Sequence, residues 1–304
     1  MEQMISAWKD NLTEEIARVK YPWLFDTSVS YNNAVFGENN IGLIVYYAEW
    51  LSGEFKGDIW LEGSFNGVFS GNNWHAGRFM DGTFQGVTWH GGEFVKGNFI
   101  KGNFLSGRFL SGKFLSPAYW TKGDFESGSF EGSWYSGTFK GGSFKGDWHQ
   151  GVFETGTFEG KWGGGLFRSG TFKGSWHNGV FESGSFIGDW EEGMFKSGTF
   201  KGIWGDGHFR NGTFDGTWNN GRFSDGVFDG IWYQGHFHGG IFNSGTWVDG
   251  IFLGGTINSC NWKNGKFNSG IINDILWEDG MIVDNSQLKP ELLNDKTKFL
   301  KIRK

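Results

Sequence analysis

Residues 157–190 read TFEGKWGGGLFRSGTFKGSWHNGVFESGSFIGDW, and this stretch decides the fold. An aromatic residue recurs at steps of four or five residues, with a glycine two positions before each ring. Every third aromatic is a tryptophan, so the tryptophans stand fourteen residues apart. The same spacing holds over a longer range, at Trp134, Trp148, Trp162, Trp176, Trp190, Trp204, Trp218 and Trp232. A self-similar period this short predicts a repeat architecture rather than an ordinary globular domain.

Outside that range the same trio of aromatics recurs at steps near fifteen residues, as at Trp60, Trp74 and Trp89. Within each unit, glycine and the aromatic alternate with polar residues, which is typical of a strand with one buried face. Pairs such as Asn178-Gly179 and Ser183-Gly184 have the composition of turns. Each unit is therefore expected to form a short strand followed by a bend.

Charged residues favour a solenoid over an antiparallel meander of five-residue strands. The residue after the second aromatic of each trio alternates in sign, in the order Glu126, Lys140, Glu154, Arg168, Glu182 and Lys196. If one coil holds three units, unlike charges lie about 4.8 Å apart on neighbouring coils. Each such contact contributes roughly 0.2–1 kcal/mol. We therefore predict an all-β fold, an elongated repeat β-solenoid with three short sides and 14–15 residues per coil.

Three regions are predicted along the chain. Residues 1–48 form a non-repeating, partly α-helical segment, with a helix over Ile5–Val19 and a strand over Ile41–Tyr47. Residues 49–285 form the solenoid, with a bulge near Pro117 and a smaller isoleucine filling towards its end. Residues 286–304 form a basic tail. The two ends are expected to cap or attach the solenoid.

Composition narrows the possible functions. The net charge is −6, which disfavours nucleic acid as a partner. The single cysteine, Cys260, excludes an intramolecular disulfide framework. The N-terminus shows no apolar segment typical of secretion, and no run of about 18 apolar residues is present. We therefore expect synthesis in the host cytoplasm without a signal peptide or a membrane span.

No catalytic, cofactor or metal site is predicted. Most histidines follow a tryptophan and are interpreted as solvated surface residues. Aspartates that precede a glycine, such as Asp249 and Asp279, lack the denser glycine pattern of calcium-binding β-rolls. Cys260 has no recognisable base beside it. The chain is accordingly predicted to be a non-enzyme, and a solenoid enzyme acting on polysaccharide is the less favoured reading.

Two kinds of outward surface are candidates for binding. Hydroxyl side chains form a ladder that could contact ice or glycan, at Ser129, Ser143, Thr157, Thr171, Ser185, Thr199 and Thr213. Apolar side chains form the candidate interface. It consists of a belt, Val95, Ile100, Leu105, Leu110 and Leu115, and a stripe, Val152, Leu166, Val180 and Met194. Continuous exposed apolar area usually marks a partner surface, and a partner chain or the N-terminal segment is expected to cover the belt.

The Gly-x-Phe-x-x unit resembles pentapeptide-repeat proteins over roughly residues 50–282, although glycine replaces their usual alanine. It looks more like the glycine/aromatic repeat proteins of tailed-phage virions. That resemblance implies a structural rod located in the virion, in the tail, baseplate or fibre, which mediates protein–protein attachment. Other virion proteins, or further copies of the chain, would be its partners, and a host-surface glycan is a further candidate. The alternatives are a surface-binding adhesin and a DNA mimic.

Overall fold

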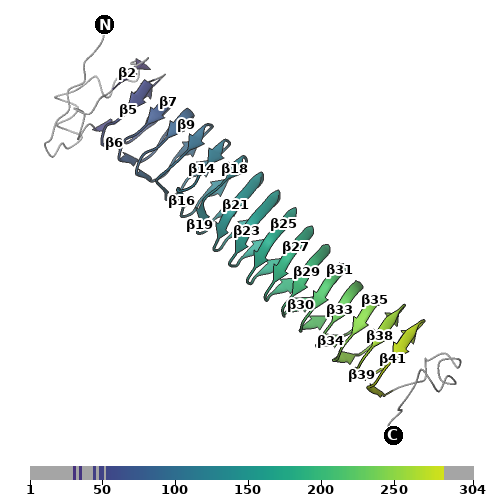
Figure 1. Cartoon of the computed structure of the whole chain (residues 1–304). Helices are drawn as coiled ribbons and strands as arrows, with labels where there is room; N and C mark the ends of the chain where they lie inside the picture. Colours follow the sequence, from purple (N-terminus) through teal and green to yellow (C-terminus); the bar gives the residue numbers. More distant parts are fainter. Residues whose placement is uncertain (1–29, 32–33, 36–43, 46–47, 51–52, 284–304) are drawn as a thin grey trace. The chain divides into compact units, whose positions relative to one another are not determined.

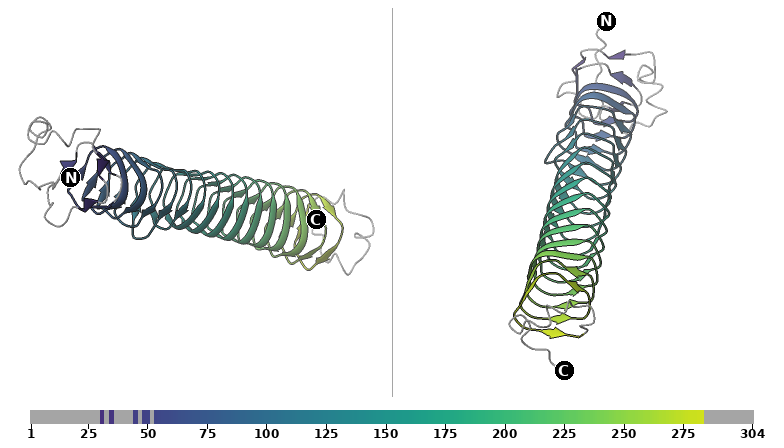
Figure 2. Two further views of the ribbon diagram at one scale, coloured as in Figure 1. Left: turned by 90° about the horizontal axis from the view of Figure 1, so that it is seen from above. Right: turned by 90° about the vertical axis from the view of Figure 1, so that its right-hand side faces the viewer.

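The computed structural model describes residues 30–31, 34–35, 44–45, 48–50 and 53–283. All secondary-structure elements in these residues are β-strands, which confirms the all-β prediction. The chain divides into two compact units, Met1–Gly156 and Thr157–Lys304. Within each unit the strands follow one another as stacked coils (Figures 1 and 2). The predicted helix Ile5–Val19 and the tail 286–304 lie outside the described residues.

The first unit holds the strands β1 to β22. They are β1 Ser30–Tyr31, β2 Ala34–Val35, β3 Ile44–Val45, β4 Ala48–Trp50, β5 Gly53–Phe55, β6 Ile59–Trp60, β7 Gly63–Phe69, β8 Asn73–Trp74, β9 Arg78–Phe84, β10 Thr88–Trp89, β11 Glu93–Phe94, β12 Asn98–Phe99, β13 Asn103–Phe104, β14 Arg108–Phe109, β15 Lys113–Phe114, β16 Tyr119–Trp120, β17 Asp124–Phe125, β18 Ser129–Phe130, β19 Ser133–Trp134, β20 Thr138–Phe139, β21 Ser143–Trp148 and β22 Val152–Phe153.

The second unit holds the strands β23 to β42. They are β23 Thr157–Trp162, β24 Leu166–Phe167, β25 Thr171–Trp176, β26 Val180–Phe181, β27 Ser185–Trp190, β28 Met194–Phe195, β29 Thr199–Trp204, β30 His208–Phe209, β31 Thr213–Trp218, β32 Arg222–Phe223, β33 Val227–Trp232, β34 His236–Phe237, β35 Ile241–Trp247, β36 Ile251–Phe252, β37 Thr256–Ile257, β38 Cys260–Trp262, β39 Lys266–Phe267, β40 Ile271–Ile272, β41 Ile275–Trp277 and β42 Met281–Ile282.

Neighbouring coils pair in parallel, one repeat period apart. Strand β25 lies beside β27 with Phe172 opposite Phe186 and Trp176 opposite Trp190. In the first unit β17 lies beside β20 in the same way, with Phe125 opposite Phe139. Each of these partners is fourteen residues further along the chain. This register confirms the β-solenoid and excludes the antiparallel meander.

Stacked rings fill the interior in three columns, two of them mainly phenylalanine and one mainly tryptophan. Along a column the rings stack face to face, at 4.7 Å between Trp176 and Trp190. Across a coil they meet edge to face, at 5.5 Å and 71° between Phe186 and Trp190. Both arrangements suit the ring quadrupole, and each pair adds roughly 0.5–1.5 kcal/mol beyond area burial. Aromatic packing therefore holds each coil on the next together with the parallel backbone pairing.

The backbone differs between coils of different length. Around β13, β14 and β15 each side of the coil is a two-residue strand, as predicted. In the second unit the step between Phe172 and Trp176 is four residues, and β25 runs through both aromatics without a break. Gly174 stands in the middle of β25 with a φ of 141°, a conformation that L side chains rarely adopt. The glycine supplies the bend that a longer coil makes at a corner.

The predicted irregularities are confirmed. The chain turns between Leu115 and Ala118, whose N–H donates to the Leu115 carbonyl at 3.0 Å. Paired residues on neighbouring coils are therefore sixteen positions apart there, with Phe114 opposite Phe130. Towards the other end Ile257 and Ile272 continue the column after Phe242, its last phenylalanine. Both isoleucines are fully buried, so the smaller filling is part of the core.

Pairing in the first unit reaches back to Ser30, which lies opposite Glu49. Ile44, within the predicted strand Ile41–Tyr47, lies opposite Ile59. Parallel coil-to-coil pairing thus already includes strands β1, β2 and β3, N-terminal to the expected start of the repeat at residue 49.

Candidate interaction surfaces

Because rings occupy the interior, only outward residues are available to bind other molecules. The buried indoles are themselves satisfied in most coils: Trp176 Nε1 donates to the main-chain oxygen of Glu192 at 3.1 Å. Trp134 makes the same bond to Gln150 in the first unit. The interior is thus filled by rings, and candidate sites lie on its outer faces.

The belt residues lie on all sides of two successive coils, as the sequence predicted. Leu110 follows Val95 in one column, since their N–H groups donate to the carbonyls of Phe94 and Phe79. Leu115 follows Ile100 in the same way, and Leu105 occupies the third column. All five side chains are half-buried rather than fully exposed. Larger apolar exposure lies nearby at Val87 and Tyr119, which are 57% and 46% exposed.

The apolar stripe is also in register within the second unit. Leu166 lies opposite Val180, and Val180 lies opposite Met194. In the first unit Val152 lies opposite Thr138. All four stripe residues are half-buried. Beyond Met194 the column changes character, because His208 and then Arg222 follow.

The hydroxyl ladder runs along the face made by the six-residue strands. Thr171, Ser185 and Thr199 are direct neighbours on successive coils, with Thr157 before them and Thr213 after them. In the first unit Ser129 lies opposite Ser143. The adjacent column of the second unit is mixed, and contains Glu159, Lys173, Ile187, Lys201 and Asp215. The face is therefore regular but is not a uniform plane of hydroxyls.

Several of the predicted ladder contacts are present as ion pairs. Lys140 Nζ lies 2.8 Å from Glu126 Oε1, and Lys196 lies at the same distance from Glu182. Arg108 bridges Glu93 at 3.0 Å and Glu126 at 3.2 Å. The hydrogen bond from Lys140 lowers the pKa of Glu126. Opposite charges on successive coils thus neutralise one another along the surface.

The histidines fall into different environments. His75 stacks on His90 with ring centroids 4.4 Å apart, and its pKa is lowered by burial and then by His90. His177 Nδ1 lies 2.6 Å from Glu191, whose hydrogen bond raises the pKa of the imidazole. Burial lowers the pKa values of His208 and His238, and Arg222 lowers both further. Across the described residues, no group of three or more His, Cys, Asp or Glu is placed to hold a metal ion.

Cys260 is buried, with 5% of its surface exposed. Burial raises the pKa of its thiol to about 12. A thiol that stays protonated at neutral pH is a poor nucleophile. The structure therefore gives Cys260 a packing role.

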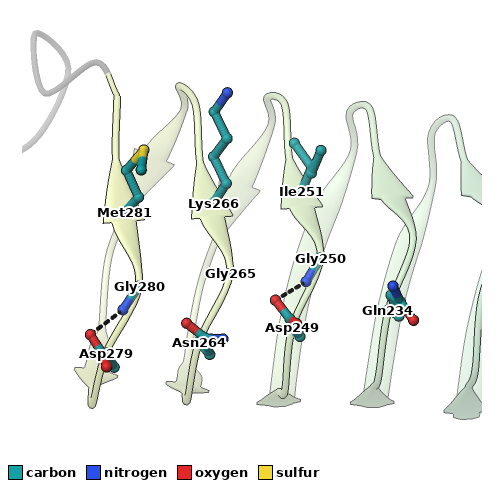
Figure 3. Close-up of a pocket in the computed structure, with 10 residues that line it drawn as sticks. All are labelled: Gln234, Asp249, Gly250, Ile251, Asn264, Gly265, Lys266, Asp279, Gly280 and Met281. Carbon is teal, nitrogen blue, oxygen red and sulfur yellow. Dashed lines mark hydrogen bonds between the residues drawn. The ribbon is translucent and has the colours of Figure 1, made fainter.

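A hollow of about 550 Å³, not expected from the repeat pattern, lies on the last coils of the second unit. Asp249, Asn264 and Asp279 form one row, while Ile251, Lys266 and Met281 form another (Figure 3). Gly250, Gly265 and Gly280 lie between the rows and make the floor. Two features of the sequence could have indicated this hollow: the change to fifteen-residue steps after Trp232, and the polar residues that recur at each step.

Comparison of the chain with family models, curated proteins and solved structures finds no match. In the part of the chain that the structure describes, no helix has the length and apolar character to cross a membrane.

Proposed function

We propose that this chain is a non-enzymatic structural component of a phage virion, belonging to the tail, baseplate or fibre, and that its outer apolar residues attach it to other virion proteins. The observation that carries the proposal is the interior filled with stacked rings. Such a core gives a stiff scaffold. The assignment to a virion is supported by the resemblance of the glycine/aromatic repeat.

The belt is the proposed attachment surface. Leu105, Leu110 and their three companions present apolar side chains on every side of two coils. An apolar surface of this kind is stabilised when a partner covers it. Further copies of the chain are a second kind of partner for the same surface.

Particle composition and a matched pair of variants test this role. Mass spectrometry of purified virions is expected to detect the chain in stoichiometric amount. Leu105→Lys is expected to reduce its incorporation severalfold, because a charge replaces a covered apolar side chain. Thr121→Lys is the control, since Thr121 occupies the same outer column one coil later. Virions without the chain, or equal incorporation of both variants, would contradict the proposal.

A surface-binding adhesin is the second candidate, and the regular hydroxyl ladder favours it. Replacing Thr157, Thr171 and Thr199 with tyrosine tests it, since unchanged attachment to the receptor surface would exclude this face. A DNA mimic is less well supported, because lysine and arginine neutralise the carboxylates at Glu93, Glu126 and Glu182.

A further inference from the structure

We infer that the hollow on the last coils is a groove that binds a neutral polysaccharide. It is lined by Gln234, Asp249, Gly250, Ile251, Asn264, Gly265, Lys266, Asp279, Gly280 and Met281. Its volume, about 550 Å³, falls within the usual range for small-ligand sites. This inference does not depend on the proposed virion role.

The polar row of the groove offers hydrogen-bond acceptors. One carboxylate oxygen of Asp249 accepts the N–H of Gly250 at 2.7 Å, and Asp279 does the same with Gly280 at 2.8 Å. Each carboxylate keeps a second oxygen for a ligand. Asn264 stands between the two aspartates and is exposed. The row therefore suits a ligand that carries many hydroxyl donors.

The hydrogen bonds from indole N–H groups to main-chain carbonyls are lost at the same coils. Trp218 still donates its indole N–H to the oxygen of Gln234 at 3.1 Å. The next three indoles, those of Trp232, Trp247 and Trp262, are fully buried and have no acceptor. The corresponding carbonyls, on Asp249, Asn264 and Asp279, therefore lack the indole donor that Gln234 has. Internal hydrogen bonding is thus incomplete along the groove, which favours an outside donor there.

The opposite row supplies contacts of another kind. Ile251 and Met281 are apolar, and Met281 is 48% exposed. Lys266 lies between them, and no ion pair to its ammonium is found within the described residues. A pyranose ring presents apolar C–H faces as well as hydroxyls, so it can contact both rows together.

The repeat of the groove suits a linear polymer. Successive coils here stack their indoles at 4.7 and 4.8 Å, so the same side-chain positions recur at that interval. Each groove position therefore recurs on the length scale of one sugar ring. A chain of sugars lying along the groove would meet a polar residue of one row and a residue of the other row at each coil.

Two other polymers fit less well. A peptide cannot add as a strand, because the N–H groups of Ile251, Lys266 and Met281 already donate to glycine carbonyls of the preceding coil. A nucleic acid would bring its phosphates against Asp249 and Asp279. A neutral polysaccharide avoids both conflicts.

The test uses the full chain and linear neutral hexasaccharides of glucose, mannose, galactose and N-acetylglucosamine, in α and β linkage. Saturation-transfer NMR and calorimetry are expected to show binding of at least one of them. The double variant Asn264→Ala, Lys266→Ala is expected to bind it at least about tenfold more weakly, because hydrogen bonds at two positions are lost. Lys263→Ala is the control, since Lys263 is exposed but does not line the groove.

A second pair of variants preserves the local backbone bond. Asp249→Asn retains an acceptor for the Gly250 N–H and is expected to weaken binding, because the charged acceptor is lost. Asp225→Asn is its control, as Asp225 accepts the N–H of Gly226 at 2.7 Å but lies outside the groove. Failure of every hexasaccharide to bind, or equal binding by groove and control variants, would overturn the inference. Leu105→Lys should leave saccharide binding unchanged, which separates this result from that of the proposed virion role.

Discussion

The coils around residues 89–114 and those around residues 157–232 hold the same three aromatic columns but connect them differently. In the first region each ring belongs to its own two-residue strand. In the second, one six-residue strand carries a phenylalanine and a tryptophan through a glycine bend. The stacked rings are therefore the constant part of the fold. In the second region a four-residue step with a central glycine separates the phenylalanine from the tryptophan.

Replacing the bend glycine should have the largest effect on that difference. A Cβ at Gly174 would overlap the main-chain oxygen of Gly160, and the φ of 141° would strain any L residue. We expect Gly174→Ala to lower the free energy of unfolding by roughly 2–6 kcal/mol, from backbone strain and overpacking together. Chemical denaturation followed by circular dichroism measures it.

Gly141→Ala is the control for that change. A Cβ at Gly141 would find its nearest neighbour, the Glu126 oxygen, at 3.6 Å, an ordinary contact. Its effect should stay within about 1 kcal/mol. Equal losses in the two variants would show that glycine serves chain flexibility in general rather than the bend.

Removing an indole ring from the tryptophan column should have the next largest effect on stability. Trp176→Ala removes an indole that stacks on both Trp162 and Trp190, and we expect a loss of about 3–5 kcal/mol. Trp176→Phe should cost less, about 1–2 kcal/mol, because a ring still fills the column. In the first unit Phe104 already takes the place of a tryptophan, with its ring stacked 4.1 Å from that of Trp120. Equal losses for alanine and phenylalanine would mean that the hydrogen bond of the indole, not stacking, dominates.

Much of this architecture could be predicted from the sequence because the period is short and regular. The spacing of Trp176 and Trp190 fixes coil length, and the alternation of Glu126 and Lys140 fixes which residues become neighbours. The continuous strand through Gly174 was not predicted, since the sequence gives the step length but not the dihedral angle.

The groove could not be predicted for a related reason. Asp249, Asn264 and Asp279 resemble earlier polar residues that precede a glycine, such as Asn178 and Asp206. Only the backbone shows that the indole bonds are missing beside the later set and present beside the earlier one.

A pH titration should separate the contributions of two histidines, His75 in the first unit and His177 in the second. The pKa of His75 in the first unit is lowered, so its unfolded form binds a proton more readily than its folded form. Its contribution to stability is present above about pH 6.5 and is lost as the pH falls towards the folded pKa. The pKa of His177 in the second unit is raised, so its contribution is present below about pH 6.5 and is lost as the pH rises through the folded pKa.

We therefore expect His75→Asn to flatten the acid side of the stability profile and His177→Asn to flatten the neutral side. Denaturation midpoints between about pH 5 and 8 measure both, within the range where histidine titrates. The same change in slope for both variants would contradict the assigned environments.

The smallest effect should come from the surface ladder. Lys140 lies 2.8 Å from Glu126 and 3.4 Å from Asp124, and the hydrogen bond with Glu126 raises the pKa of the lysine. Lys140→Gln should therefore cause a small loss of stability at low salt, because solvent still reaches and screens this half-buried pair. That loss should vanish near 1 M salt, where the screening length falls to about 3 Å. Lys145→Gln is the control, since Lys145 is exposed and no ion pair to it is found among the described residues. If the loss of stability in Lys140→Gln persists in high salt, the alkyl chain of Lys140 contributes by packing. The alternating charges would then select the register of the coils more than they stabilise them.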